Sequence, residues 1–437
     1  MREYTCRDHQ SRLSIILLSA LGLQLVSVAY YAVFVRENGY LPSPFVVNKF
    51  DTFMDLYNTM WWGAQDGRYT EWKSVYPPLN FLLLGGLRDL FFPQGVFGDP
   101  LDLQQTTVGP AVVIAAMHII APFFAIAWSD WRIFRPLDRA LIALIAVLSP
   151  ILLFSLERGN ILIWPFFLLP LLFSKRDSIW KTTFLALIIN LKPYFALLLF
   201  GYLIVGDWRR FMQAIAISGG VFLITGLAVD ANFPLFLSNL LSFAGNDSVL
   251  SGREVLALPA SLSSFSYSIN IFLKTDSDPT RYATLLPALP PLIEAVKYTL
   301  LLSASGSLVF ARHKVRVEEA FTLLLLFTVT AGIWAGGYSQ IFYLVAVPVL
   351  ARMAMRWIHL SLMLAIFMPL DLITLHTDPS WYMISYISHS IVDVHWQLGL
   401  GTILRPPLNA LLIASISLEL FSRALWAKKL QSRMTYS

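Results

Sequence analysis

The stretch that decides the fold runs from Asn48 to Asn80 and reads NKFDTFMDLYNTMWWGAQDGRYTEWKSVYPPLN. It is polar and rich in aromatic residues, and it separates a first apolar segment from a long series of further apolar segments. Four carboxylates lie within it, at Asp51, Asp55, Asp66 and Glu71. A protein that only needed to span the bilayer would join its first helices by a short turn, whereas binding and catalytic residues concentrate on loops. This segment is therefore predicted to form half of an active site.

The remainder of the chain has the composition of a helical membrane protein. Of its 437 residues, 57% are hydrophobic and only 14% are charged, whereas soluble globular proteins carry roughly 25% charged residues. Apolar runs recur from end to end, and several are long enough to cross a bilayer core of about 30 Å. Barrel strands would alternate apolar and polar residues, which these runs do not. The expected fold is all-α, a polytopic bundle of transmembrane helices that forms a single domain over residues 1–437.

The net charge of +5 does not indicate a nucleic-acid partner, because the basic residues cluster in short connectors where they set topology. The clearest connector is DWRIFRPLDR at residues 130–139. The positive-inside rule then gives about twelve spans with both termini cytoplasmic, plus a re-entrant or interfacial helix at residues 79–92. Loops at residues 36–78 and 230–290 would face the outside, the second with an interfacial helix near residues 255–273. The expected location is the plasma membrane, with membrane lipids as its surroundings.

Several of the expected helices are short. Four of them have about ten to fifteen residues, below the roughly twenty that cross a full hydrocarbon core; they are expected at residues 140–154, 161–173, 182–191 and 195–205. Their outer ends would stop within the membrane, where backbone turns are tolerated only if they line a water-filled cavity. A funnel open to the outside is therefore expected. Later crossings are expected at residues 292–310, 320–334, 341–351, 358–375 and 408–425.

Lys192 is the clearest candidate for a functional charge. It lies between two apolar segments, far from the basic connectors, and Pro193 prevents its turn from being ordinary helix interior. An ionisable side chain at membrane depth is costly and indicates function, and this ammonium would suit an anion such as a phosphate. The alternative is a lysine whose head group reaches back to the interface. Arg158 is a similar candidate, although it could instead pair with its neighbour Glu157.

Asp51 and Asp55 are candidates for a general base. Residues four apart on a helix share a face, and a carboxylate beside an apolar wall can be poised to accept a proton. The alternative is a solvated loop whose aspartates cap helices. The neighbouring aromatic residues, among them Trp72 and Tyr76, could stack on a sugar or belong to the aromatic belt of the membrane interface. The segment Tyr76-Pro77-Pro78 is expected to start a helix, since proline suits the first turn.

No ligand pattern indicates a metal or another cofactor, so none is expected. The sequence lacks a GxGxxG fingerprint, a Walker motif and a Gly-x-Ser-x-Gly elbow. Its histidines are scattered without the spacing of metal ligands, at His118, His359, His376, His389 and His395 among others.

Four short motifs follow one another along the chain: YPPL at residues 76–79, ERGN at 157–160, NLKPY at 190–194 and GGYSQIFYLVAVP at 336–348. Together with the acidic, aromatic segment that precedes them, they resemble glycosyltransferase family 87 of the GT-C superfamily. Members of that family are multipass mannosyl- and arabinofuranosyltransferases that use polyprenyl-phosphate sugars. The resemblance covers most of the chain, from Asp51 to Pro348.

The resemblance implies a bacterial plasma-membrane glycosyltransferase. It would move a sugar, a hexose such as mannose or a pentose, from a polyprenyl-monophosphate donor to a lipid-linked glycan or polysaccharide acceptor. The transfer would occur on the extracytoplasmic side, usually with inversion and without a metal. Asp51 matches the family's general base, with Asp55 as the rival. Lys192 would hold the donor phosphate, with help from Arg158.

The resemblance also implies residues that shape the cavity, namely Tyr76, Pro77 and Asn160. From the first loop we further expect Glu71 and Trp72 to bind substrate. One position departs from the family pattern, because similar proteins often carry a histidine near the late motif, where Gln340 stands here. Gln340 is expected to bind substrate, and the identity of the transferred sugar is left open.

Two other classes of protein stay open. A lipid-linked-glycan flippase or a solute transporter would show paired halves with discontinuous helices in matching positions, and no such halves are visible in the sequence. A polysaccharide polymerase or ligase would also use external loops, and His376, His389 and His395 in one late loop fit that alternative. A non-catalytic scaffold would not need Lys192 at membrane depth.

Overall fold

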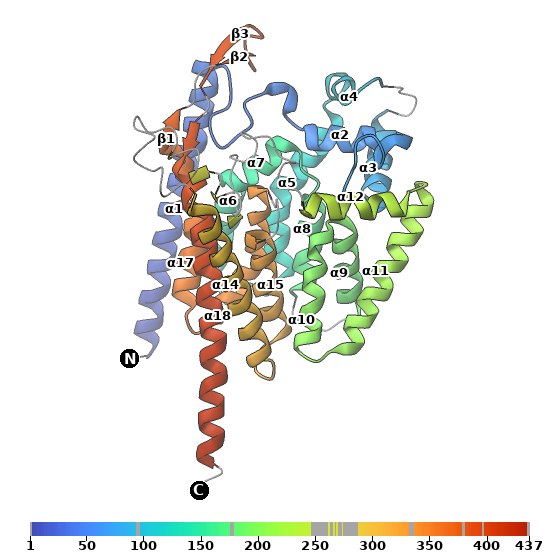
Figure 1. Cartoon of the computed structure of the whole chain (residues 1–437). Helices are drawn as coiled ribbons and strands as arrows, with labels where there is room; N and C mark the ends of the chain where they lie inside the picture. Colours follow the sequence, from blue (N-terminus) through green and yellow to red (C-terminus); the bar gives the residue numbers. More distant parts are fainter. Residues whose placement is uncertain are drawn as a thin grey trace.

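The computed structural model describes residues 2–92, 97–174, 179–245, 287–331, 336–377, 381–395 and 397–434, with a few positions between 261 and 273. Over these residues the chain is a helical bundle with two small two-stranded sheets (Figure 1). The predicted helical class is therefore confirmed. The first half of the bundle contains α1 (Arg2–Asn38), α2 (Met54–Trp62), α3 (Pro78–Phe91), α4 (Pro100–Thr106), α5 (Gly109–Trp128), α6 (Pro136–Leu148), α7 (Pro150–Arg158), α8 (Ile163–Leu172) and α9 (Trp180–Leu191).

The second half contains α10 (Leu199–Ile204), α11 (Trp208–Ala228), α12 (Phe233–Gly245), α14 (Leu289–Phe310), α15 (Val317–Ala331), α16 (Val347–Leu350), α17 (Arg356–Phe367) and α18 (Leu400–Met434). Short 3-10 helices connect them, at η1 (Lys49–Asp51), η2 (Asp66–Arg68), η3 (Pro193–Leu198), η5 (Gly337–Ala346) and η6 (Leu370–Leu372). The strands are β1 (Thr374–Thr377), β2 (Trp381–Ile384), β3 (Ile391–Val394) and β4 (Gln397–Gly399).

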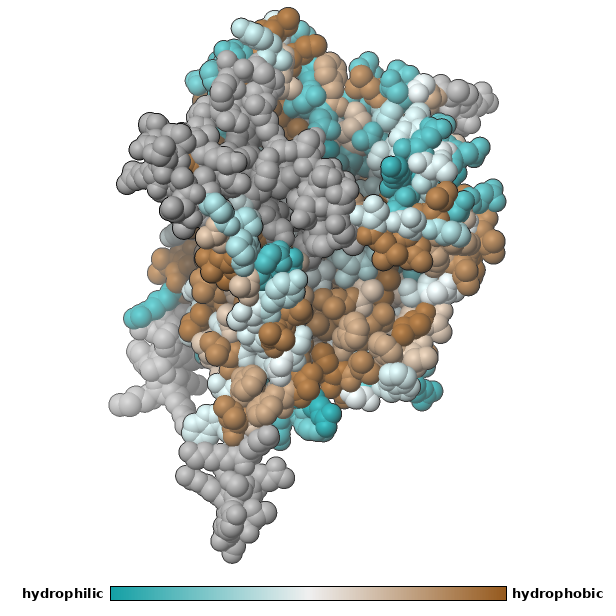
Figure 2. All heavy atoms as spheres, in the orientation of Figure 1, coloured by the Kyte–Doolittle hydropathy of each residue, from teal (hydrophilic) through white to brown (hydrophobic). Residues whose placement is uncertain are grey.

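The bundle is that of a membrane protein. Among the described residues, five helices are long and apolar enough to cross a membrane, or six if α6 and α7 form one bent span. The five lie at Arg12–Asn38, Gly109–Trp128, Trp208–Ala228, Leu289–Phe310 and Leu400–Trp426. Hydrophobic side chains gather over the lower part of the surface, and hydrophilic ones gather above them (Figure 2). The full number of about twelve spans stays a prediction.

Proline residues account for two helix boundaries that differ from those expected from the sequence. Residues 140–154 form two helices rather than one, because the chain bends by 48° between α6 and α7. Pro150 occupies the first turn of α7, and the Ser149 hydroxyl caps that helix by accepting a hydrogen bond from the Leu152 amide at 3.3 Å. Residues 358–375 do not continue as one helix, since α17 ends at Phe367 before Pro369.

Three further boundaries differ from the sequence-based expectation. The helix expected at residues 341–351 is mostly the 3-10 helix η5. The final helix begins at Leu400, well before the expected residue 408, and continues through two prolines. Part of the loop expected at residues 230–290 is helix α12, whose Phe236 packs on Tyr69 with ring centroids 5.7 Å apart. Most of the helix expected near residues 255–273 lies outside the described residues.

Buried polar contacts join the helices that are distant in sequence. The Gln24 amide of α1 donates to the Phe367 carbonyl of α17 at 2.7 Å. Arg405 of α18 and Asp371 of η6 form an ion pair with neither side chain exposed. Such groups are costly to bury without partners, so these contacts specify how α1, α17 and α18 pack.

The upper end of the bundle carries the irregular segments. The chain between α1 and α3, which contains η1, α2 and η2, lies there with α4 and α7, whereas both termini lie at the lower end (Figure 1). The sheets also lie at the upper end, where β1 pairs with β4 and β2 pairs with β3, both antiparallel. The short elements η1, α2, η2, α4 and α7 therefore lie together at one end of the molecule.

Candidate active site

Helix α7 ends at the point where the first loop packs on the bundle. Gly159 follows the helix with φ of 62°, the left-handed conformation that glycine adopts without steric cost. The amide of Phe53 donates to the Glu157 carbonyl at 2.7 Å. The loop backbone is thus anchored directly to the last turn of α7. This contact brings the acidic first loop and the ERGN motif at residues 157–160 together.

Asp51 and Asp55 do not lie on one helix face, contrary to the expectation from their spacing of four residues. Asp51 ends η1 and Asp55 lies in the first turn of α2, and Phe53 between them has φ of 58°. This left-handed residue breaks the helix and turns the chain. Both carboxylates nevertheless reach the same side chain, because they flank the turn that packs on α7.

Arg158 bridges the two aspartates. Its Nη1 donates to Asp51 Oδ2 at 2.5 Å and to the Asp51 carbonyl at 3.1 Å, while Nη2 donates to Asp55 Oδ1 at 2.7 Å. The described structure shows no ion pair between Arg158 and Glu157, the alternative that the sequence had left open. A planar guanidinium holds two carboxylates at fixed separation, so this arginine sets the geometry of the loop.

The two aspartates differ in how fully they are bound. Asp55 has both oxygens occupied, since Oδ2 accepts from the Asn160 amide at 2.6 Å. Asp51 Oδ1 accepts no hydrogen bond from the described residues, and its side chain is 28% exposed against 19% for Asp55. A base needs an oxygen that the acceptor can reach. Asp51 is therefore better placed than Asp55 to take a proton.

Lys192 lies close enough to this cluster for Asp55 to act on it electrostatically. Helix α9 ends at Leu191, and Lys192 has an extended backbone before Pro193. Its Nζ lies 4.7 Å from the ring centroid of Tyr76, a cation–π contact. Its ammonium makes no hydrogen bond or ion pair within the described part of the chain.

The Tyr76-Pro77-Pro78 segment is positioned by the end of α9. Pro77 is buried and α3 begins at Pro78, as predicted. The Asn80 amide donates to the Leu191 carbonyl at 2.9 Å, which ties the first turn of α3 to the last turn of α9. The contact between Tyr76 and Lys192 follows from this anchoring.

The remaining predicted residues lie further out. Glu71 is exposed, and Trp72 packs edge-on against Trp61 with ring centroids 4.8 Å apart. Gln340 is buried in η5, where its amide donates to the Gly337 carbonyl at 3.0 Å and its oxygen accepts from Asn409 at 3.4 Å. None of these three residues contacts the carboxylates in the described structure.

Tyr386 is a contact of the site that the sequence did not single out. It follows β2, and its hydroxyl lies 2.7 Å from Thr52 Oγ1, which in turn donates to Glu157 Oε1 at 3.4 Å. Burial, with the carboxylate of Glu157 next in importance, raises the pKa of the Tyr386 phenol. The phenol therefore stays protonated. The signal was available, since residues 381–394 form two short apolar runs around a Ser-His-Ser turn.

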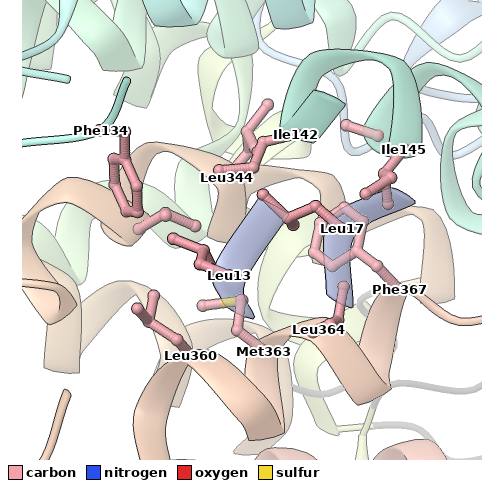
Figure 3. A pocket seen from close by; sticks show the side chains of 12 residues that line it. Leu13, Leu17, Phe134, Ile142, Ile145, Leu344, Leu360, Met363, Leu364 and Phe367 are labelled. Carbon is pink, nitrogen blue, oxygen red and sulfur yellow. The ribbon is translucent and has the colours of Figure 1, made fainter. Parts of the chain in front are cut away.

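Other polar and apolar features are structural. His118 is buried and bonded to the Ile114 carbonyl at 2.7 Å and to Ser155 Oγ at 2.9 Å. Within the described ranges, no three His, Cys, Asp or Glu side chains gather as metal ligands would. An apolar cavity of about 80 Å³ lies where α1 meets α6 and α17, lined by residues such as Leu17 and Met363 (Figure 3). The described residues that line it include no ionisable group.

Comparison with known proteins found no match: no family model, curated protein or solved structure is similar to this chain. Function has to be inferred from the site itself.

Proposed function

We propose that this protein is a membrane glycosyltransferase of the GT-C type that uses a polyprenyl-monophosphate sugar. It transfers the sugar to a lipid-linked glycan or polysaccharide acceptor. Two observations carry the proposal. Asp51 is held by Arg158 and has an oxygen that accepts no hydrogen bond from the described residues. The ammonium of Lys192 lies over Tyr76 and makes no ion pair within the described part of the chain. A base for a hydroxyl and a cation for a phosphate are the two groups that this reaction needs.

The chemistry can be written on the residues of the site. An acceptor hydroxyl oxygen attacks the anomeric carbon of the donor while Asp51 takes the hydroxyl proton. The bond between the anomeric carbon and the phosphate oxygen breaks, and the polyprenyl monophosphate leaves with the bonding electron pair. Lys192 neutralises the charge that develops on that phosphate. Arg158 and Asn160 keep the carboxylates in position and take no part in the proton transfer.

The proposed orientation puts this chemistry outside the cytoplasm. The site lies at the upper end of the bundle, opposite both termini (Figure 1). The connector between α5 and α6, which contains Arg132 and Arg135, lies at the lower end, and Arg139 lies in the first turn of α6. Basic connectors favour the cytoplasmic side. We therefore propose a multi-pass plasma-membrane enzyme with about twelve spans and both termini in the cytoplasm.

Sugar transfer in proteoliposomes tests the proposal. Purified protein is reconstituted and supplied with a panel of radiolabelled polyprenyl-monophosphate hexoses and pentoses, with a parallel panel of nucleotide sugars and with total membrane glycolipid as acceptor. Label should move to the acceptor from at least one polyprenyl-phosphate sugar and from no nucleotide sugar. Transfer from nucleotide sugars alone, or none from any lipid donor across varied acceptors, would exclude the proposed donor class.

A further inference from the structure

A second polar region lies at the opposite end of the bundle from the carboxylates. A cavity of about 1070 Å³ opens between the last turns of α5 and α8 and the first turns of α6 and α9. Its described lining includes three basic residues, Arg132, Arg139 and Lys181, together with three tryptophans, Trp128, Trp131 and Trp180. The proposed transferase reaction uses none of them.

The cavity is lined by buried polar groups that lack partners. Within the described residues, Arg139 Nε, Trp131 Nε1 and the Ser129 hydroxyl are buried without a hydrogen bond. Trp131 is only 1% exposed, so solvent does not satisfy its N–H. Unpaired buried donors destabilise a fold. Three such groups around one cavity therefore indicate a ligand that accepts hydrogen bonds.

The charge of the cavity indicates that this ligand is an anion. Among the described residues that line it, the one carboxylate is Asp130, which is neutralised by Arg352, with Nη2 and Oδ2 2.6 Å apart. Lys181 has Glu318 at 3.7 Å. Arg132 and Arg139 face no carboxylate in the described structure. Guanidinium groups recognise phosphate oxygens through paired hydrogen bonds.

The rim of the cavity indicates that the ligand is also a lipid. Trp128, Trp180 and Ile133 line it and are exposed by 53%, 62% and 41%. Exposed aromatic and aliphatic side chains at the end of a membrane helix lie among lipid head groups and upper chains. A soluble anion has no apolar part that would contact this rim.

We infer that this cavity binds the phosphate head group of an anionic phospholipid from the leaflet at the end of the bundle where both termini lie. Arg132 and Arg139 hold the phosphate, and Trp131 and Ser129 satisfy their hydrogen bonds on the head group. The acyl chains run along the exposed tryptophans. Basic pockets between helices at one membrane face bind acidic lipids in this way.

Native mass spectrometry of the full chain in neutral detergent tests this site. The protein is titrated with phosphatidylglycerol or with phosphatidylcholine of the same chains, and the apparent Kd of the first bound lipid is measured. The test variants are Arg132→Gln and Arg132→Gln/Arg139→Gln; the Arg132 side chain is exposed and has no ion-pair partner among the described residues. The matched control is Arg209→Gln/Lys314→Gln, which removes two exposed charges at the same end but outside the cavity.

Phosphatidylglycerol should bind more tightly than phosphatidylcholine, and the double variant should weaken it about thirtyfold, or about 2 kcal/mol for two basic residues. Arg132→Gln alone should cause part of the loss without disturbing folding, and the control should retain wild-type binding. Equal Kd values for the two lipids, or an equal loss in the control, would overturn the inference. Displacement of the lipid by millimolar inorganic phosphate would also overturn it, because the ligand would then be a free anion.

Discussion

Arg158 and Lys192 carry the same charge but have different surroundings. Arg158 directs both terminal nitrogens to carboxylates. Lys192 lies over the ring of Tyr76 and has no hydrogen-bonded partner among the described residues. A cation that is already paired gains little from a new anion, whereas an unpaired one gains a charge-assisted hydrogen bond. We therefore propose that Lys192 binds the donor phosphate and that Arg158 holds the first loop in position.

Lys192→Ala should weaken use of the donor. A hydrogen bond to a charged group contributes about 2 kcal/mol, so kcat/KM for the donor should fall roughly thirtyfold. Lys192→Arg should restore part of the activity because the charge is retained. Lys73→Ala is the matched control, since this lysine is exposed on the same loop. Initial rates at varied donor concentration measure all three, and an equal loss in Lys73→Ala would remove the special role of Lys192.

The sequence predicted individual side chains of this site better than their partners. Asp51, Asp55, Arg158 and Asn160 were all candidates, and the structure brings them together. The bridge from Arg158 to the aspartates could not be read from local spacing, because more than a hundred residues separate them. The local neighbour Glu157 was the only partner that spacing could suggest. Long-range pairing depends on the packing of the whole bundle.

At the scale of the element, Gly159 connects helix α7 to the loop. Its φ is 62°, and a Cβ at this position would lie 2.8 Å from Phe53 Cδ1 and 3.1 Å from Phe53 Cα. The Phe53 Cα belongs to the backbone, which cannot easily shift to make room for the added Cβ. Gly206 also has a positive φ, 81°, but a Cβ there would meet nothing within 4 Å. Alanine substitutions at these two glycines therefore separate the effect of a steric clash from the effect of the left-handed backbone conformation.

Gly159→Ala should destabilise the protein more than Gly206→Ala. Both changes place alanine in the left-handed region, which costs roughly 1–2 kcal/mol, and only the first adds a clash with the loop. Thermal unfolding in detergent should show a larger fall in Tm for Gly159→Ala, accompanied by loss of sugar transfer. Equal Tm values for the two variants would mean that the loop does not depend on this contact.

The segment around β2 and β3 supports the loop from outside. The Tyr386 hydroxyl contacts Thr52, the residue after Asp51. Tyr386→Phe removes the contact with Thr52 and a longer one with the Val46 carbonyl at 3.4 Å. The loss should be about 1 kcal/mol, so kcat should fall about fivefold while the KM for the donor stays constant. Because burial raises the pKa of Tyr386, the contact is complete below that pKa and should not cause a loss of rate between pH 7 and roughly 9.

Tyr382→Phe serves as the control for this prediction. Tyr382 lies on the same hairpin and is 77% exposed. The Tyr382→Phe variant should transfer sugar at the wild-type rate. A fall in kcat of the same size in both variants would show that the hairpin acts through general stability rather than through Thr52.

The elements that the sequence did not predict share a physical cause. Prolines mark helix starts in α3 and α7 but lie inside α18, so proline alone does not define a boundary. The strands have only three or four residues each, too few for periodicity to stand out in an apolar chain. Helix existence was predictable from apolar runs, whereas breaks and hairpins depended on tertiary contacts.

At the scale of the whole molecule, the two ends of the bundle have different chemistry. The elements η1, α2 and α7, which carry the carboxylates and Arg158, and the two small sheets lie at the upper end (Figure 1). The cavity with Arg132 and Arg139 is lined by the chain that joins α5 to α6, at the other end of α5. Composition was sufficient to predict a helical membrane protein, because burial in lipid requires apolar helices. The direction of each span was predicted from charge alone.

Cysteine labelling checks this orientation. Cys6 is the single cysteine, so Cys6→Ser provides a background without thiols. In that background, Glu71→Cys at the upper end and Lys314→Cys at the lower end both replace exposed residues. A membrane-impermeant maleimide should label Glu71→Cys in intact cells and Lys314→Cys only after permeabilisation. The reverse pattern would place the site in the cytoplasm.

The most direct test of the central claim compares Asp51→Asn with Asp55→Asn in the proteoliposome transfer assay. Loss of a general base should lower kcat about 10²- to 10⁴-fold, and donor binding should persist because Lys192 is unchanged. Asp51→Asn should show this loss, and the exposed loop residue Asp66 provides the control Asp66→Asn. Wild-type transfer by Asp51→Asn would contradict the assignment of Asp51 as base, and wild-type transfer by both Asp51→Asn and Asp55→Asn would contradict the proposed site.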